Sequence, residues 1–304
     1  MKPSASAALL ISALRLLPKN TISRLAGRLV SIHLPQLSIH LPQPLQRWQI
    51  LLASRWFGID LDEVRDPLAS FGCFQDFFVR ALAPGSRPID PAPDAIVSPC
   101  DGAWGESGYV SDGQVLQLKG RPYSLAALLG NVADAKYYEG GSFATLYLSP
   151  ADYHRFHSPC DVSVSRFRYL PGSLWPVNRA GLEGIDSLFA QNERICAFMD
   201  VAGQAQPEGV CVVAVGATMV GKIRLTFDPL SSNCAGAGAE VREYGEGFAT
   251  PSPQLATGAE WGRFEFGSTL VMLLADGAGQ LDFQSPGSPV RMGSRIGRLR
   301  PIAA

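Results

Sequence analysis

The 304-residue chain lacks several features, and each absence excludes a class of protein. Charged residues make up only 17% of the sequence and the net charge is −1, which excludes a protein whose whole surface binds a polyanion such as nucleic acid. No apolar run reaches the roughly 18–20 residues that span a bilayer; the longest early run, residues 7–14, is followed by Arg15. G-x-S-x-G, H-E-x-x-H, G-x-G-x-x-G and P-loop motifs are absent, so common hydrolases, zinc proteases and nucleotide-binding enzymes have no support.

Cysteine is present, but not in a pattern that binds metal or forms a disulfide framework. The six cysteines are irregularly spaced and include no C-x-x-C pair. In a chain of this length they are expected to be small buried hydrophobic residues in a reducing compartment. They are Cys73, Cys100, Cys160, Cys196, Cys211 and Cys234.

Acidic residues are missing from the first part of the chain. Seven of the 26 Lys and Arg residues precede Asp60, the first acidic residue, and the rest of the chain holds 19 basic and 27 acidic residues. This basic, leucine-rich segment predicts an arm that docks on anionic lipid, although a solvated helical extension would have the same composition. The basic residues expected to contact lipid are Arg15, Lys19, Arg24 and Arg28.

Two regions of the chain differ in periodicity and turn content. Residues 1–65 are predicted to be helical, interrupted by Pro18 and by a seven-residue duplication within 31–44. After Pro67, a short helix with an apolar face precedes many short strands. The pattern predicts an α+β protein, with 1–65 as a helical membrane-docking arm and 66–304 as a β-rich catalytic domain. The expected strands are 95–97, 115–119, 143–148, 162–169, 195–200, 210–214, 221–227 and 264–275, and the expected helices 124–129 and 184–190.

Three short clusters contain the residues that could carry chemistry. His154 and His157, two of only four histidines, stand three apart in a proline-containing segment after a predicted strand, so both can point toward one site. Asp101 precedes a glycine, which taken alone is ordinary turn chemistry. Ser268 follows Gly267 within a predicted strand, where a glycine often marks a bend or a close backbone approach.

Together the clusters resemble the phosphatidylserine decarboxylases of the compact bacterial type, which are pyruvoyl enzymes. The resemblance covers nearly everything after residue 65 and consists of blocks in the family's order. The blocks are FQDFFVR (74–80) with RPID (87–90), SPCDG (98–102), YLSPADYHR (147–155), LPGSLWPVN (170–178), LFAQNER (188–194), VGATMVG (215–221) and GRFEFGST (262–269). The family motif usually has leucine where this chain has Phe266, an apolar replacement.

The resemblance implies that Ser268 becomes the pyruvoyl group when the chain cleaves itself between Gly267 and Ser268. Asp101 and His157 match the residues that activate this serine, which needs a base oriented by a carboxylate to act as a nucleophile. The products would be a β chain, 1–267, and an α chain, 268–304, held together as a heterodimer that could itself dimerise. No pyridoxal phosphate and no metal would be required.

The implied reaction converts phosphatidylserine to phosphatidylethanolamine and CO₂ through a Schiff base to the pyruvoyl group. His154 is the expected proton donor, although His157 could serve instead. The implied location is the cytoplasmic side of the inner membrane, as a peripheral protein.

Three alternatives remain at this point. A metal-dependent hydrolase would use Asp101, Asp152, His154 and His157, but would give Gly267 and Ser268 no role. A biotinyl or lipoyl carrier domain would need an exposed lysine in a hairpin turn. A degenerate relative would bind lipid without being cleaved.

Overall fold

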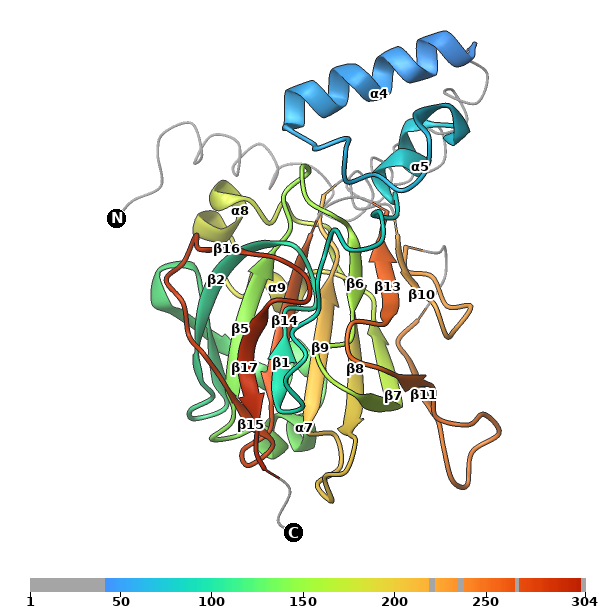
Figure 1. Ribbon diagram of the computed structural model, residues 1–304. Helices are drawn as coiled ribbons and strands as arrows, with labels where there is room; N and C mark the ends of the chain where they lie inside the picture. Colours follow the sequence, from blue (N-terminus) through green and yellow to red (C-terminus); the bar gives the residue numbers. More distant parts are fainter. Residues whose placement is uncertain (1–41, 219–221, 234–237, 266–267, 302–304) are drawn as a thin grey trace.

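A computed structural model describes residues 42–218, 222–233, 238–265 and 268–301. Its centre is a nine-stranded antiparallel sheet with the order β11-β7-β8-β9-β14-β5-β2-β16, in which β12 also pairs with β7. Figure 1 shows β1, β17 and β15 in front of this sheet and α7 and α9 behind it. The predicted α+β class is confirmed. The strands of the large sheet are β2 (Gly102–Tyr109), β5 (Ser142–Tyr147), β7 (Val162–Leu170), β8 (Arg194–Val201), β9 (Val210–Val215), β11 (Glu240–Glu243), β12 (Gln254–Leu255), β14 (Thr269–Leu274) and β16 (Pro289–Val290).

The middle of the large sheet is buried on both faces. Every residue of β9 and of β14 is buried, as their continuous apolar sequences require. On one face, α6 (Leu125–Leu129) is tied to the sheet by the Arg194 guanidinium, which donates to the carbonyls of Ala127 and Leu128 at 2.6 Å. β14 therefore lies at the centre of the core.

The expected single strand over 264–275 is wrong. The chain leaves one sheet at the end of β13 (Glu260–Phe264) and enters another at β14. β13 belongs to a small sheet with β10 (Ile223–Leu225) and β6 (Arg155–His157). Because apolar residues occur on both sides of the change, hydrophobicity alone could not locate it. Ser268 lies directly before β14 and outside the strand.

Helix α4 (Gln43–Phe57) is the helix that the structure describes within the predicted arm, whereas residues 58–65, also expected to be helical, form turns and a bridge between Val64 and Leu82. Gln46, Ile50 and Ser54 are buried at four-residue spacing and form the face toward the body. The helix ends at Gly58, whose φ of 75° is the left-handed conformation that favours glycine. Residues 1–41, with all but the last three residues of the duplication and with the four basic residues expected to contact lipid, lie outside the described residues. No helix in the described ranges is long and apolar enough to cross a membrane.

The remaining elements are short. The predicted helix over 124–129 is confirmed as α6, which begins after Ser124, whose hydroxyl accepts the Ala127 N–H. Five of the six cysteines are free and buried, and Cys234 lies outside the described residues. The other helices and strands are η2 (Leu68–Ser70), α5 (Phe74–Phe78), β1 (Ala95–Val97), β3 (Gln114–Gln117), η3 (Leu118–Gly120), β4 (Arg121–Ser124), α7 (Val132–Tyr137), α8 (Arg179–Gly184), α9 (Leu188–Gln191), β15 (Gly279–Leu281) and β17 (Arg295–Leu299).

Candidate active site

One end of the large sheet brings the predicted site residues close together in the fold. Asp101 directly precedes β2 and Ser268 directly precedes β14, with the end of β5 between them. The Leu148 N–H donates to the Ser268 carbonyl at 2.8 Å, so the segment that carries both histidines starts beside Ser268. Gly102 permits this approach, since its φ is 148° and a Cβ there would lie 2.2 Å from the Tyr147 carbonyl oxygen.

Ser268 is completely buried. Its hydroxyl donates to the backbone carbonyl of Val215, the last residue of β9. The hydroxyl is therefore held beside a neighbouring strand. Gly267, the other half of the expected cleavage site, lies outside the described residues.

His157 is buried at the end of β6 and is held in one tautomer. Its Nδ1 lies 2.8 Å from the Gly258 carbonyl oxygen, which can only accept, so Nδ1 carries the proton. Nε2 lies 3.2 Å from the Tyr153 hydroxyl and accepts from it. Burial lowers the pKa of His157, although the hydrogen bond to Gly258 acts in the opposite direction. The residue is thus a neutral imidazole with a basic Nε2.

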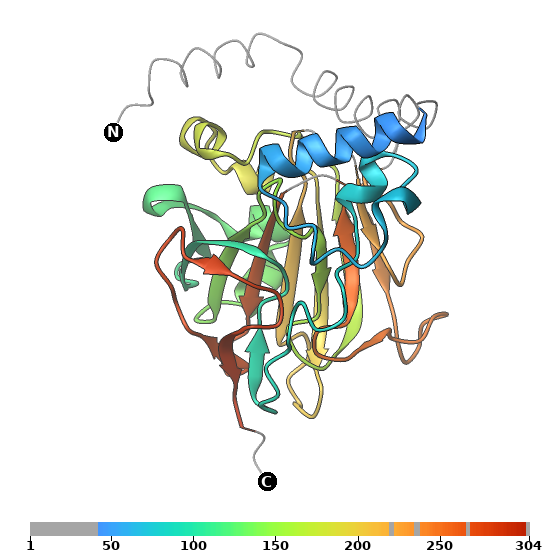
Figure 2. The same ribbon diagram turned by 45° about the horizontal axis from the view of Figure 1, so that its top comes forward.

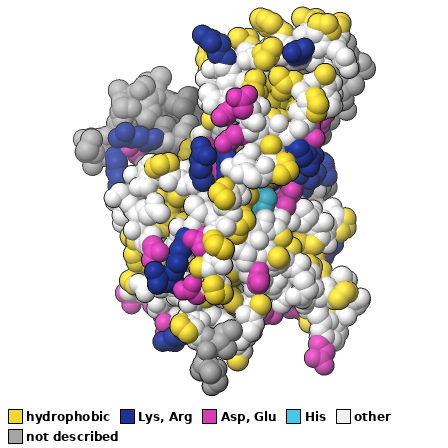
Figure 3. Space-filling view, in the orientation of Figure 1, with side chains coloured by type: hydrophobic (Ala, Val, Ile, Leu, Met, Phe, Trp, Pro, Cys, Tyr) yellow, Lys and Arg dark blue, Asp and Glu magenta, His cyan; other side chains and the backbone are white. Residues whose placement is uncertain are grey.

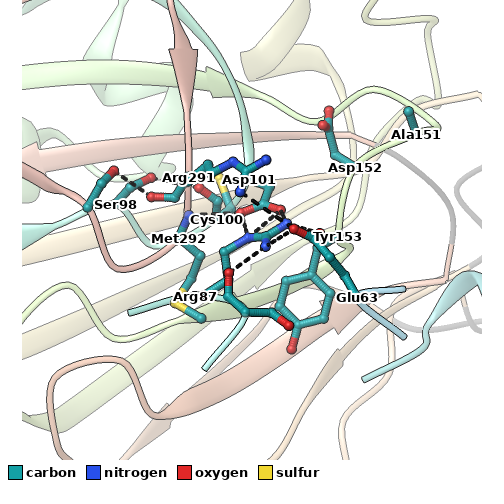
Figure 4. A network of polar contacts seen from close by, with 12 residues as sticks. Glu63, Arg87, Ser98, Cys100, Asp101, Ala151, Asp152, Tyr153, Arg291 and Met292 are labelled. Carbon is teal, nitrogen blue, oxygen red and sulfur yellow. Dashed lines mark hydrogen bonds and ion pairs between the residues drawn. The ribbon is translucent and has the colours of Figure 1, made fainter. Parts of the chain in front are cut away.

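Asp101 is held by an arginine (Figure 4). The Arg87 Nε lies 2.8 and 2.9 Å from the two carboxylate oxygens of Asp101, and Nη2 lies 2.6 Å from Oδ2. The Met292 N–H also donates to Oδ1 at 2.8 Å. The same guanidinium binds both carboxylate oxygens of Glu63 at 2.9 and 2.8 Å. Burial disfavours the Arg87 charge, but the hydrogen bonds to Asp101 and Glu63 outweigh it and raise the pKa of Arg87.

His154 has a different environment from His157. It is fully buried, and its ring centroid lies 4.1 Å from that of Phe78. Neither ring nitrogen makes a hydrogen bond of ordinary geometry among the described residues, although the Asp152 backbone lies close enough to raise the pKa slightly. Burial, followed by the positive charge of Arg80, lowers the pKa of His154 to about 3. The imidazole is therefore neutral in the protein without substrate.

The chain is similar over most of its length to proteins of one family. The model of the phosphatidylserine decarboxylase family matches residues 74–298. The chain belongs to this family. A phosphatidylserine decarboxylase proenzyme from Anaeromyxobacter sp. (strain K) is 43% identical over 293 residues, covering 95% of this chain and 98% of the relative. Proenzymes of the same name from Brevibacillus brevis and Myxococcus xanthus are 37% and 36% identical, covering 85% and 93% of this chain and 86% and 96% of the relatives. As a member of this family, the chain is a carboxy-lyase.

Among the described residues, no direct hydrogen bond links the Asp101, His157 and Ser268 side chains to one another. The backbone N–H of His157 donates to the Pro99 carbonyl at 2.7 Å, which places the histidine beside the segment that carries Asp101. In the part of the chain that is described, however, His157 is oriented by Gly258 and Asp101 by Arg87. The roles assigned to Asp101, His154, His157 and Ser268 stay predictions.

Sequence reasoning missed three residues of this site. Arg87 holds Asp101, Tyr153 donates to His157, and Arg80 lies beside His154. All three stand in the sequence blocks on which the family resemblance rests, and this is the signal that could have identified them. The pattern of a single sequence does not show which residues they contact. Within the described ranges, no three His, Cys, Asp or Glu side chains gather closely enough to hold a metal ion, so the metal-dependent alternative has no ligand set there.

Proposed function

We propose that this protein decarboxylates phosphatidylserine with a pyruvoyl group that it makes from Ser268. The observation that carries the proposal is the convergence of Asp101, His157 and Ser268 at one end of the large sheet, in a chain of this family. The buried position of all three side chains supports it, because a dry site strengthens the polar interactions that such chemistry uses.

In the proposed self-cleavage, the Ser268 hydroxyl turns from Val215 and transfers its proton toward Nε2 of His157. The Ser268 oxygen bonds to the Gly267 carbonyl carbon, and the Gly267–Ser268 C–N bond breaks as the proton passes from His157 to the departing nitrogen, which leaves an ester and a free amine. Loss of the Ser268 α-proton then expels residues 1–267 with a C-terminal carboxylate. Water replaces the nitrogen of residue 268 and releases ammonia.

The position of residue 268 is suitable for a pyruvoyl group. Its carbonyl stays bonded to Leu148, and the six residues of β14 that follow pair with β5 and β9. Residues 268–304 also contribute β15, β16 and β17, so the two products would remain a heterodimer. When present, the pyruvoyl carbonyl would accept the electrons released as CO₂ leaves. His154 would return a proton to the substrate carbon, with His157 as the alternative donor.

We also propose that α4 contacts the membrane. Figures 1 and 2 show α4 lying beyond the end of the large sheet at which β14 begins, and Figure 3 shows hydrophobic and basic side chains on this part of the surface. Trp48 is 59% and Trp56 83% exposed, as expected of aromatic residues that insert at a lipid interface. The helix contains basic but no acidic residues, which suits anionic lipid on the cytoplasmic side of the inner membrane. The exposed large hydrophobic residues of α4 are Leu45, Trp48, Leu51, Leu52, Trp56 and Phe57.

Intact mass measured under denaturing conditions tests the self-cleavage. We expect the wild type to give two chains divided between residues 267 and 268, the smaller one blocked at its N-terminus, whereas Ser268→Ala remains one chain of 304 residues. Ser142→Ala is a matched control, because Ser142 is also a buried serine but pairs with Leu274 at the far end of β14; it should cleave like the wild type. A wild type that stays whole at 32.6 kDa would contradict the proposal and favour a lipid-binding relative.

A further inference from the structure

Arg80 is a buried cation without a complete set of partners. It follows α5 and is 4% exposed, and its guanidinium carbon lies 5.3 Å from the Phe77 ring centroid. Nη2 donates to the carbonyls of Ala151 and Asp152 at 3.2 and 3.3 Å, whereas Nε and Nη1 are buried with no hydrogen-bond partner. A buried charge left in this state is strongly unfavourable unless something else compensates it.

Arg194 shows how the same fold satisfies an arginine that has a structural role. It is 5% exposed, close to the value for Arg80. Its Nε, Nη1 and Nη2 donate to the carbonyls of Leu128, Asn192 and Ala127 at 2.6, 2.7 and 2.6 Å. A purely structural role for Arg80 would predict a similar set of acceptors, and Arg80 does not have them.

The carboxylates near Arg80 are bound to other donors. Asp101, Asp152 and Glu63 are close enough to stabilise the charge of Arg80. Asp101 and Glu63, however, hold Arg87 between them, and Asp152 accepts the Ser149 N–H at 2.7 Å. Across the described residues, no carboxylate makes an ion pair with Arg80, so an anion from outside the chain could do so.

His154 lies close to Arg80. Its two ring nitrogens are also buried without a hydrogen bond of ordinary geometry, the Asp152 backbone acts on the ring only as a minor influence, and the charge of Arg80 acts on it directly. Phe78, two residues before Arg80, packs on the His154 ring. Arg80 and His154 are thus buried neighbours, and only a short segment of chain separates His154 from Leu148, whose N–H donates to the Ser268 carbonyl.

We propose that Arg80 binds an anionic oxygen group of the phospholipid headgroup next to His154. Phosphatidylserine carries two such groups, the carboxylate and the phosphodiester, and a guanidinium recognises both. The inference rests on the proposed function and adds a substrate-binding residue to it.

The proximity of Arg80 and His154 also suggests how His154 could obtain its proton. An anion on Arg80 would cancel the repulsion that helps to keep His154 neutral, so substrate binding would raise the pKa of His154. The histidine would then become a better proton donor only when the headgroup is in place.

The test compares the processed wild type with Arg80→Gln and Arg80→Lys. Arg242→Gln is the control, because it removes one positive charge on β11, where Arg242 pairs with Asp228 and Glu240. Intact mass first establishes cleavage, which involves no substrate and should be unchanged. The measurements are kcat/KM for short-chain phosphatidylserine and the inhibition constant of short-chain phosphatidylethanolamine, which has the phosphodiester but no carboxylate.

We expect Arg80→Gln to lower kcat/KM about thirtyfold or more, since one partner of a buried charge pair is lost. Arg80→Lys should retain part of the activity and Arg242→Gln all of it. Unchanged inhibition by phosphatidylethanolamine in Arg80→Gln would identify the carboxylate as the bound group, and inhibition weakened by a similar factor would identify the phosphodiester.

A cleaved Arg80→Gln enzyme with kcat/KM within about twofold of the wild type would overturn the inference. If that variant does not fold, as judged by circular dichroism, Arg80→Lys decides instead, and unchanged kcat/KM and inhibition would overturn it. A wild type that cleaves itself but does not decarboxylate phosphatidylserine would contradict the proposed function, and the inference with it.

Discussion

Acidification should destabilise this protein through His154. The pKa of this histidine is lowered from 6.5 to about 3 in the folded protein, by burial first and then by Arg80. Between these values the unfolded chain binds a proton that the folded protein does not, so acid favours unfolding. The stability is fully present above about pH 6.5 and is lost progressively as the pH falls toward 3.

The size of the effect follows from the difference between the two pKa values. Each pH unit below 6.5 costs about 1.4 kcal/mol, so His154 alone should lower the free energy of unfolding by about 2 kcal/mol at pH 5. Other groups titrate over the same range. Their contribution is removed by comparing the protein with His154→Gln, which leaves those groups in place but cannot bind the proton.

The assay is urea unfolding at pH 7.5 and pH 5, followed by circular dichroism. Both proteins should carry Ser268→Ala, so that a single uncleaved chain unfolds in each case. We expect the loss of stability on acidification to be about 2 kcal/mol larger with His154 than with glutamine. Equal losses in the two proteins would show that His154 is not held neutral by its surroundings, and would refute the argument.

Three further changes have defined outcomes. Arg87→Ala should slow self-cleavage about tenfold or more in an intact-mass time course, because it leaves the buried Asp101 carboxylate without its cation. Cleavage at the wild-type rate would show that Arg87 has no role in this reaction. The pair Trp48→Ser and Trp56→Ser should weaken sedimentation with anionic vesicles about tenfold without affecting cleavage, and unchanged sedimentation would count against docking by α4. Gly262→Ala should lower the free energy of unfolding by about 1–3 kcal/mol in urea, because its Cβ would lie 2.2 Å from Cε2 of the Phe156 ring; wild-type stability would show that the ring can move.

The sequence predicts helices and strands where the residues of the element itself show an apolar run or capping residues. The continuous apolar runs of β9 and β14 require burial on both faces, and the first of these was located within one residue. Helix α6 lies in the predicted range 124–129, where an apolar run stands between Ser124 and Gly130, the residues that cap it. In these cases the determining contacts are local.

The contacts between distant residues could not be predicted in the same way. Glu63, Arg87 and Asp101 meet because three separate segments pack together, and no periodicity connects them. The family resemblance placed Asp101 and His157 in one site, but it could not show that each is bound to a different partner in the folded chain. The exposed face of α4 was missed for a similar reason, since only the packed helix shows that Gln46 faces inward and Trp48 outward.

The central position of β14 has a consequence for how long one molecule can work. The strand begins immediately after Ser268 and pairs along its whole length with β5 and β9. If the chain is cut before Ser268, the fragment that carries the reactive group could leave only when the middle of the core opens on both sides. A molecule whose reactive group had been chemically destroyed could therefore not take up a fresh fragment. Such a molecule would stay inactive, and the cell would recover the activity only by making a new precursor.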